Sequence, residues 1–286
     1  MNAGGSARTT YIGSTVERLL VRTWNVFHGN ADPPERTAFL EECVRLAVAD
    51  HPDVVCLQEL PVWALGELEG WSAMTSVADV AQRPHLGPLP STRRIGRALT
   101  DLNHALLRSA FTGQANAILL GSQVRVLEHR HVPLNPYGFR RAQARRLGLG
   151  ILPRLAWGKE RRLCQVLRVE RGDETFILAN VHVTGSTDKR IPDAELLRAA
   201  VFVDGVARPD EPVLLAGDFN LTLKNSSTLP ALLTTDWGFT GATPVGIDHV
   251  LVRGLTAGEP VRWARERRTE GGRVLSDHPP VDREVQ

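Results

Sequence analysis

The sequence predicts an α/β protein of the α+β kind, built on mixed or antiparallel sheets and not on a doubly wound parallel sheet. Short apolar runs bounded by polar, Gly or Pro residues recur along the chain, and few helical patterns separate them. The chain has 286 residues, of which 42% are hydrophobic and 23% charged. It is therefore long enough to bury a full core and has the composition of an ordinary globular protein.

The first part of the chain alternates strands with a helix. Residues 18–25 are mostly apolar and predict a first strand. Apolar residues at helical spacing over 35–49, with acidic residues in the first half, predict a helix. Residues 53–60 then predict a buried strand, on which Glu59 is expected to share one face with Leu57 because side chains alternate along a strand.

The middle of the chain is less regular. A helical stripe over residues 95–107 precedes an apolar run at 115–120 that predicts a strand, and residues 124–132 predict its antiparallel neighbour. Residues 133–159 are rich in Gly, Pro and Arg and have little periodicity. They predict a long loop, of the kind that is usually functional or mobile in a compact domain.

The last part of the chain returns to strands. Alternating residues at 163–169 and 175–183 predict a hairpin, and residues 194–206 predict a helix. Residues 213–216 and 246–252 predict two further strands, each with an acidic residue at one end.

The expected boundaries follow from composition. The N-terminus is small and polar, without the charged-then-apolar order of a secretory signal, and predicts a flexible arm over residues 1–17. One domain is expected over residues 18–286, since no linker composition divides it. No apolar run approaches the roughly 20 residues that span a bilayer. We therefore expect a cytoplasmic protein without a transmembrane segment.

Positive charge is concentrated in the middle of the chain. The formal net charge is only +2 at pH 7, but residues 125–168 hold ten arginines and one lysine against two glutamates, a local net charge of +9. Such a block predicts a landing surface for a polyanion. The alternative is a solvated arginine-rich loop whose charge is balanced by acidic neighbours in space.

The most informative local pattern is Gly217-Asp218-Phe219-Asn220, directly after the apolar residues 213–216. Side chains two apart on a strand point the same way, so Asp218 and Asn220 are expected on one face. A carboxylate and an amide there can hold a metal or orient a water, and Gly217 allows backbone or substrate to come close. The alternative is an ordinary turn, in which the Asp and Asn side chains bond their own backbone.

Polar residues recur at the ends of the other predicted strands. In chain order the set is Asn25, Glu59, Asn180, His182, Asp218, Asn220, Asp248, Asp277 and His278. Each alone has a structural alternative, such as a turn cap for Glu59 or a hydrogen-bonded core position for His182. Asn180 is expected to be structural, as is His249, which points away from Asp248 along the same strand.

The order and local context of these residues resemble the endonuclease/exonuclease/phosphatase superfamily of metal-dependent phosphohydrolases. The matching motifs are TWNV (23–26), LQE (57–59), GQANAILL (113–120), NVHVTG (180–185), GDFN (217–220), IDHV (247–250) and SDH (276–278). The resemblance implies a four-layer sandwich, in which two mixed β-sheets pack face to face and helices flank them. It also implies a catalytic site where strand ends and loops meet at one edge.

The metal site is implied by the same resemblance. Glu59 is expected to be the main ligand of Mg²⁺, with Asn25 beside it. Asp277 is expected either to complete the set of metal ligands or to serve as an alternative ligand. Mg²⁺ is a hard ion served by one or two carboxylates and waters, and Mn²⁺ is the alternative cofactor.

The remaining residues are expected to carry the chemistry. Asp218 would orient or deprotonate the attacking water, and Asn220 would hold that water or a phosphate oxygen. His278, with its tautomer fixed by Asp248, and His182 would both face the phosphate.

The leading hypothesis is a phosphodiesterase or endonuclease that acts on nucleic acid with little sequence specificity. Abasic-site endonucleases of the superfamily usually have Thr-Lys after the glutamate. Here Leu60-Pro61-Val62 follows Glu59, which argues against abasic-site repair. The histidine at 182, together with His278, resembles the deoxyribonuclease and sphingomyelinase branches. Substrate-binding residues are expected in the arginine-rich block, namely Arg140, Arg141, Arg161 and Arg162.

Two alternatives stay open. Apolar residues among the arginines, such as Ile151, Leu152 and Leu155, suit a phosphodiesterase or phosphatase acting on a phospholipid, and a small phosphorylated metabolite is a related substrate. A non-catalytic binding scaffold that kept the fold is the third hypothesis. No obligate protein partner is inferred. The sequence does not decide between endo- and exo-cleavage, diester and monoester, one metal and two, or between oligomeric states.

Overall fold

The structure is a computed structural model that describes residues 18–35, 38–86, 89–102 and 112–286. The arm predicted over residues 1–17 lies outside the described residues, as does the end of the helix predicted over 95–107.

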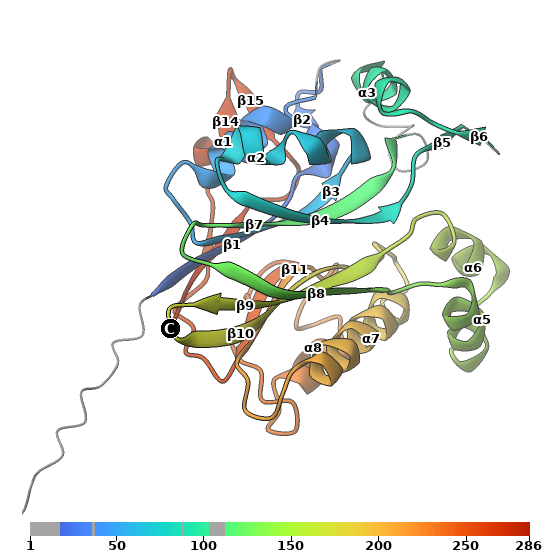
Figure 1. The fold of residues 1–286 in the computed structure, drawn as a ribbon. Coiled ribbons are helices and arrows are strands. Elements are labelled where there is room, and N and C mark those ends of the chain that lie inside the picture. Colours follow the sequence, from blue (N-terminus) through green and yellow to red (C-terminus); the bar gives the residue numbers. More distant parts are fainter. Residues whose placement is uncertain (1–17, 36–37, 87–88, 103–111) are drawn as a thin grey trace, which may run out of the picture.

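Two sheets form the centre of the molecule (Figure 1). The six-stranded sheet has the order β13 (Val261–Arg262), β16 (Val281–Val285), β1 (Leu19–Asn25), β3 (Val54–Leu60), β7 (Gln114–Leu120), β4 (Thr75–Gln82). The five-stranded sheet has the order β12 (Asp248–Arg253), β11 (Val213–Asp218), β10 (Glu174–His182), β9 (Leu163–Arg171), β8 (Arg125–Pro133). In the first sheet β1 is parallel to β3 and antiparallel to β16, and in the second β10 is parallel to β11 and antiparallel to β9. Both sheets are therefore mixed, as predicted.

Helices cover the outer face of each sheet. In Figure 1, α1 (Leu40–Val48) and α2 (Leu68–Ser72) lie over the six-stranded sheet, while α7 (Arg190–Val206) and α8 (Thr228–Leu232) lie under the five-stranded sheet. Three apolar cores match this layering: one beneath α1 and α2, one between the sheets, and one against α7 and α8. The predicted four-layer sandwich is confirmed.

Smaller elements complete the chain. They are α3 (Arg93–Leu102), the short strands β2 (Ala31–Asp32), β5 (His85–Leu86), β6 (Leu89–Pro90), β14 (Thr269–Glu270) and β15 (Arg273–Leu275), and the 3-10 turns at Phe27–Gly29, Val62–Gly66 and Glu266–Arg268. Every helix in the described part of the chain is too short or too polar to span a bilayer.

The prediction of a long loop over residues 133–159 is wrong. This segment contains two helices, α5 (Tyr137–Arg146) and α6 (Ile151–Trp157). Arg, Ala and Gln favour α5, but its face lacks a continuous apolar stripe. The two helices instead share one small core, made of Ala144, Leu149, Trp157 and, from α7, Ile191. Because two short helices divide this apolar set between them, sequence periodicity did not reveal either.

The pairing predicted between residues 115–120 and 124–132 is also wrong. β7 pairs with β3 and β4, whereas β8 crosses to the other sheet and pairs with β9. The reason is β4, a half-exposed strand that the sequence analysis missed, which occupies the second edge of β7.

Candidate active site

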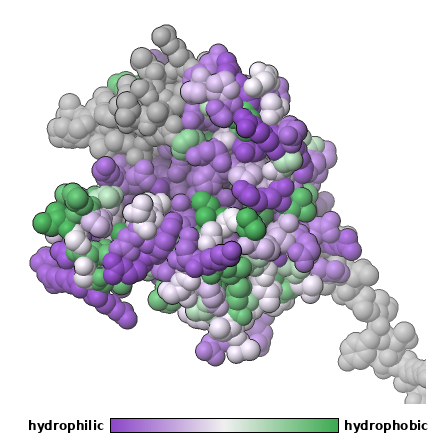
Figure 2. Space-filling view, turned by 180° about the vertical axis from the view of Figure 1, so that it is seen from behind, coloured by the Kyte–Doolittle hydropathy of each residue, from purple (hydrophilic) through white to green (hydrophobic). Residues whose placement is uncertain are grey.

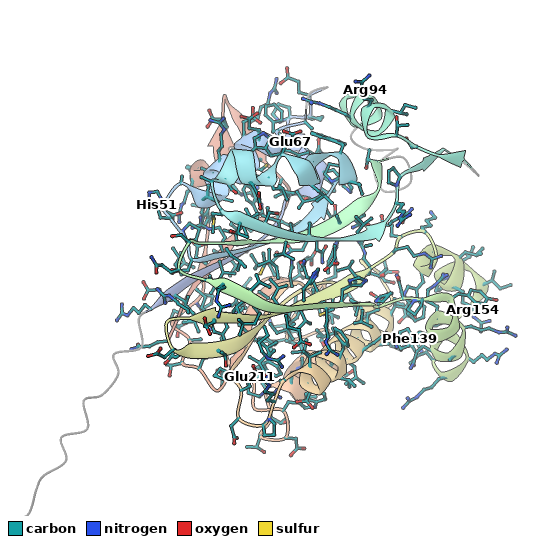
Figure 3. All side chains as sticks on the ribbon, viewed as in Figure 1. His51, Glu67, Arg94, Phe139, Arg154 and Glu211 are labelled. Atoms are coloured by element: carbon teal, nitrogen blue, oxygen red, sulfur yellow. The ribbon has the colours of Figure 1, made fainter. Side chains whose placement is uncertain are left out.

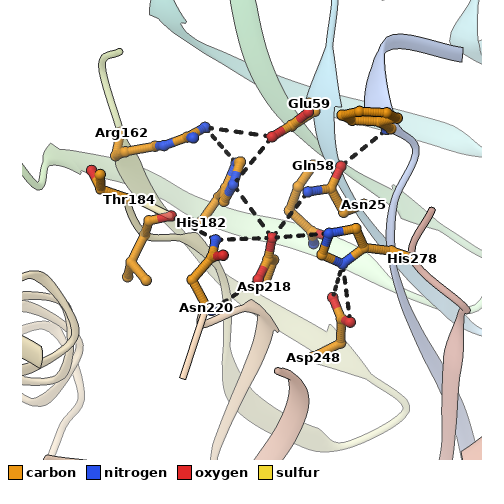
Figure 4. Close-up of polar contacts among 12 residues, drawn as sticks. Asn25, Gln58, Glu59, Arg162, His182, Thr184, Asp218, Asn220, Asp248 and His278 are labelled. Carbon is orange, nitrogen blue, oxygen red and sulfur yellow. Dashed lines mark hydrogen bonds and ion pairs between the residues drawn. The ribbon is translucent and has the colours of Figure 1, made fainter. Parts of the chain in front are cut away.

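Four polar side chains stand at strand ends on the face between the two sheets. Alternation along each strand places Asn25 of β1, His182 of β10, Asp218 of β11 and Asp248 of β12 on the face that carries the inter-sheet core, in line with residues such as Ala216. The strand register pairs Asp218 with His182 on one side and with Asp248 on the other. Residues far apart in sequence therefore converge at one edge, as predicted (Figure 4).

Glu59 reaches the same place through a β-bulge. Strict alternation along β3 would point Glu59, like Leu57, into the core beneath α1 and α2, and that expectation is wrong. The ladder to β7 is interrupted between Leu57 and Leu60, and Glu59 has a left-handed backbone with φ 57°. A bulge re-aims a side chain, and here it brings Glu59 Oε1 to 3.6 Å from His182 Nε2 on the opposite sheet. A left-handed non-glycine residue costs about 1–3 kcal/mol, so the site holds strained backbone.

Gly217 is required by a close approach of two strands. Its φ is +143°, and a Cβ at this position would lie 1.9 Å from the carbonyl oxygen of Val181 on β10. Only glycine fits there, as the sequence indicated, and the tight packing places Asp218 directly beside His182.

Amide groups hold Asp218 in place. Asn25 Nδ2 and Asn220 Nδ2 donate to Asp218 Oδ2 at 3.0 and 3.2 Å, and the Asn220 backbone N–H donates to Oδ1 at 2.9 Å. The last bond is the turn that the sequence analysis considered as an alternative, so the turn is part of the site. Burial, together with the charge of Asp248, raises the pKa of Asp218, although the charge of His278 opposes the shift.

His278 is paired with Asp248. Its Nδ1 lies 3.1 Å from Asp248 Oδ2, and its Nε2 lies 3.9 Å from Asp218 Oδ2 (Figure 4). Although burial lowers it, the hydrogen bond with Asp248 and the charges of Asp218, Asp248 and Asp277 raise the pKa of His278 to about 10. The imidazole is therefore a cation at neutral pH and presents an N–H to the site.

The second histidine is held in the opposite protonation state. Arg162 Nη1 lies 3.0 Å from His182 Nδ1, and Gln114 Nε2 lies 3.4 Å from the same atom. Because a guanidinium only donates, His182 Nδ1 accepts and the ring proton is on Nε2. Burial, then the cations Arg162, His278 and His28, hold the pKa of His182 well below its usual range. The buried Nε2 has no hydrogen-bond partner among the described residues and is 3.5 Å from Asp218 Oδ2.

Glu59 fits a metal ion better than it fits its protein neighbours. Burial raises its pKa to about 7 against the opposing charge of Arg162. Its side chain is 15% exposed, and its basic neighbours lie beyond hydrogen-bond range, with Arg162 Nη1 at 3.8 Å and His28 Nε2 at 3.9 Å. The carboxylates of Glu59 and Asp218 lie 3.6 and 3.5 Å from the same atom, His182 Nε2, and two carboxylates so placed suit a hard divalent cation. The residues present therefore fit the metal that the resemblance implies.

Other predicted residues lie at the margin of the site. Asp277 is exposed, and it acts on the site through its charge. Arg140 Nε and Arg161 Nη1 both donate to the carbonyl oxygen of Asn135, at 3.0 and 3.4 Å, and Arg141 is exposed on α5. Of the four predicted substrate-binding arginines, Arg162 alone contacts Glu59 and His182.

The structural roles predicted for two residues agree with their contacts. Asn180 Nδ2 donates to the carbonyl oxygens of Leu57 and Ala117, which joins the two sheets. His249 is buried and its ring nitrogens meet the backbone of Thr243 and Leu221.

Sequence analysis missed two residues of the site. His28 is buried beside Glu59, and Gln114 contacts His182. Gln114 is the second residue of the GQANAILL motif and His28 follows TWNV by two positions. Proximity to a motif was the available signal in both cases.

The comparison with protein families decides the family. The model of the Endonuclease/Exonuclease/phosphatase family matches residues 23–278. The chain belongs to this family. Membership supports a metal-dependent phosphoesterase in general, and the matched range contains every catalytic and metal-binding residue predicted from the sequence.

Solved structures share the endonuclease/exonuclease/phosphatase fold with this chain. A functionally unknown conserved protein from Enterococcus faecalis V583 has 15% identity and a TM-score of 0.65 over 94% of this chain and 99% of that chain. An endonuclease/exonuclease/phosphatase from Bacteroides vulgatus has 14% identity and a TM-score of 0.65 at the same coverage. A humanized TDP2 from D. rerio has 15% identity and a TM-score of 0.60, again over 94% and 99%. No curated protein sequence matches the chain.

Proposed function

We propose that this family member is a Mg²⁺-dependent phosphodiesterase that acts on nucleic acid with little sequence specificity. One observation carries the proposal: a series of arginines leads to a site with two histidines in opposite protonation states around Asp218. Titratable groups whose environments push their pKa values apart are typical of acid–base sites.

The chemistry divides among the residues of the chain. A divalent ion held by Glu59, with Asn25 beside it, would neutralise phosphate charge and stabilise the leaving oxygen. Asp218, with its raised pKa and fixed orientation, orients the attacking water and accepts its proton. Asn220 holds this arrangement from the side of β11.

The two histidines act on the phosphate from opposite protonation states. His182 donates its Nε2–H to a phosphate oxygen, in the tautomer that Arg162 imposes. His278, kept cationic by Asp248, stabilises developing charge or protonates the leaving oxygen. The role expected for Asp277 as a metal ligand stays a prediction, as do Mn²⁺ as an alternative ion and a cytoplasmic location.

The arginines that lead to the site favour a polyanionic substrate. A cavity of about 550 Å³ between α5 and α6 is lined by Arg140, Arg141, Arg145 and Arg154, among others. Tyr137 lines both this cavity and a second one of about 310 Å³, which Arg161 and Arg162 also line. Arg162 in turn contacts Glu59 and His182. A backbone with regularly spaced phosphates can follow such a path without any contact to its bases.

A second candidate substrate is a phospholipid. The side chains of Ile151, Leu152 and Leu155 on α6 are 74%, 79% and 65% exposed, close to the arginines of α5. Figure 2 shows this end of the molecule as a hydrophobic patch beside hydrophilic residues, and Figure 3 shows Arg154 projecting outward from it. Apolar residues flanked by arginines also suit an anionic membrane surface.

A substrate panel tests the proposal. Plasmid, single-stranded DNA, RNA, phospholipid vesicles and a small aryl phosphodiester are each incubated with the protein and Mg²⁺, Mn²⁺ or EDTA. We expect cleavage of the nucleic acids with Mg²⁺ and none with EDTA. Intact nucleic acid together with cleaved phospholipid selects the second candidate, and no cleavage of any ester refutes both.

The proposed binding of substrate phosphates by the arginines of α5 is tested with the double variant Arg140→Ala/Arg141→Ala. We expect the KM for DNA to rise at least about tenfold at physiological salt, and the slope of log affinity against log salt to fall by up to about 2, one phosphate contact per arginine. Turnover of the small diester stays unchanged. Arg45→Ala, an exposed arginine on α1, is the matched control and leaves all three values unchanged. An unaltered salt slope in the double variant contradicts the proposed path.

A further inference from the structure

A second cluster of metal-ligating side chains lies outside the site described above. Asp79 of β4 meets His129 and His131 of β8, and one ligand atom from each lies within 4.8 Å of the others. His129 Nε2 is 2.6 Å from Asp79 Oδ2, and His131 Nδ1 is 2.9 Å from Asp79 Oδ1. Each carboxylate oxygen therefore faces one imidazole nitrogen.

The cluster joins the edges of the two sheets. β4 is the edge strand of the six-stranded sheet and β8 is the edge strand of the five-stranded sheet, and the two run along the same side of the sandwich (Figure 1). His129 and His131 are two residues apart on β8, so they share the face that points toward β4. The sheets already touch here, because Gln165 Nε2 donates to the carbonyl oxygen of Val77 at 3.0 Å.

We propose that Asp79, His129 and His131 bind a divalent transition metal of the Zn²⁺ kind. Imidazole nitrogen is a ligand for Zn²⁺, Co²⁺ or Ni²⁺ and is a poor one for Mg²⁺, so this site differs in ion class from the Glu59 site. Two histidines and one carboxylate leave a further coordination position for water.

The geometry needs only a small adjustment to close on an ion. Ligand atoms about 2.0–2.2 Å from a tetrahedral metal stand roughly 3.3 Å apart. One ligand atom from each residue already lies within 4.8 Å of the others, so the longest of these separations would shorten by up to about 1.5 Å. The His129 and His131 side chains are 35% and 52% exposed, so both rings have room to turn and the ion has a path from solvent, while Asp79 is buried and fixed.

Such an ion acts as a clamp between the sheets. All three ligands come from β4 and β8. Each is the edge strand of its sheet, so each has a neighbouring strand of its own sheet on one side only. His131 also lines the cavity of about 310 Å³ that Arg161 and Arg162 share, so the clamp holds one wall of the path toward Glu59. Binding that requires both edges to be in place stabilises the folded state alone.

Cobalt titration of the Glu59→Gln protein tests the site, because this background removes the main ligand of the other ion. We expect a visible d–d absorption band that saturates at one Co²⁺ per chain and is displaced by Zn²⁺ but not by excess Mg²⁺. With metal at 100 times its Kd, the Tm should rise by roughly 5 °C.

His129→Asn/His131→Asn should remove the band and the Tm shift, with Co²⁺ affinity lower by more than about 100-fold, since even residues behind metal ligands contribute 10–100-fold. His51→Asn, an exposed histidine outside the cluster, is the control and keeps both signals. The proposal is overturned if the Glu59→Gln protein shows neither signal, if Mg²⁺ displaces Co²⁺ equally well, or if the signals survive in the double histidine variant.

Discussion

Two buried charge clusters, one around Arg22 and one around Glu59, differ in how completely their groups are paired. Around Arg22, all five guanidinium N–H groups have acceptors, two on Asp282, two on Asp50 and one on the carbonyl of Ala47. Around Glu59, the basic side chains of Arg162 and His28 and the neutral imidazole of His182 remain between 3.6 and 3.9 Å away. In the same cluster Arg162 Nε is buried without a hydrogen-bond partner among the described residues.

This contrast separates structure from function. A buried ion network stabilises a fold only when every donor and acceptor is satisfied, and the Arg22 cluster meets this condition. The Glu59 cluster leaves buried charge incompletely paired and adds left-handed backbone at Glu59 and Asn220, both of which cost stability. A protein keeps such a cluster where a ligand completes it.

Glu59→Gln should give the largest effect. The amide keeps the shape of the side chain but not its charge, so metal binding is lost and turnover falls by about 10³-fold or more, since metal-bound charge stabilisation contributes several kcal/mol. The measurement is kcat with saturating Mg²⁺, with circular dichroism as the control for folding. Retained turnover would show that Glu59, like the fully paired groups around Arg22, has a structural role.

The same variant should make the metal-free protein more stable at alkaline pH. Because the pKa of Glu59 is raised to about 7 in the folded state, folding favours its protonated form, and stability is lost as pH rises from its ordinary pKa through about 7. Above that range Glu59→Gln should gain on the order of 2 kcal/mol in free energy of unfolding, and at pH 4 the gain should vanish. Urea unfolding in EDTA at both pH values measures it, and an equal gain at pH 4 would contradict the pKa shift.

Arg22→Ala should destabilise the protein by about 3–5 kcal/mol, because it removes the buried guanidinium between Asp50 and Asp282 and leaves the partly exposed Arg267 as their cation. Activity per folded molecule should stay unchanged, since the cluster does not touch the site. Arg18→Ala, also at the start of the chain but 71% exposed, is the control and should cost less than about 1 kcal/mol. A small loss for Arg22→Ala would remove the distinction between the two clusters.

Asp248→Asn should have the smallest effect and the most specific one. In the native protein the raised pKa of His278 means that its favourable charge is fully present below its ordinary pKa and is lost as pH rises through about 10. The variant removes a hydrogen bond and a charge that raise this pKa, so the alkaline limb of the kcat profile should move down by at least about one unit. A shift of one unit lowers the protonated fraction of His278 about twofold at pH 9, and the loss approaches tenfold only well above pH 10. An unchanged alkaline limb would mean that another group sets it.

Sequence reasoning located strand ends well and strand partners poorly. The period of two along a strand depends on local sequence, so His182 could be placed on one face with Asn180, and Asp248 opposite His249, before the fold was known. The convergence of these strands on one site came from the family resemblance. Which strand pairs with which depends on all the others, and β4, half-exposed and without a strong pattern, decided where β8 could go.

Local backbone exceptions were also beyond the pattern. The bulge at Glu59 interrupts the pairing of β3 with β7, and alternation along β3 does not signal it, so the side chain was assigned to the wrong face. Arg162 was expected to bind substrate, but its effect on the tautomer of His182 depends on a contact across 20 residues that no motif records.

The register between β11 and β12 has a consequence for the order of events during synthesis. Asp218 and Asp248 stand directly opposite each other, and like charges in that position repel. Their counterion, His278, is synthesised just before β16, the last strand of the described chain. β16 pairs with β1, the first strand of the described chain. A nascent chain therefore lacks the imidazolium that neutralises this carboxylate pair, and the active arrangement forms only once the final strand closes the six-stranded sheet. A phosphoesterase built this way gains its complete site only when its own folding is complete.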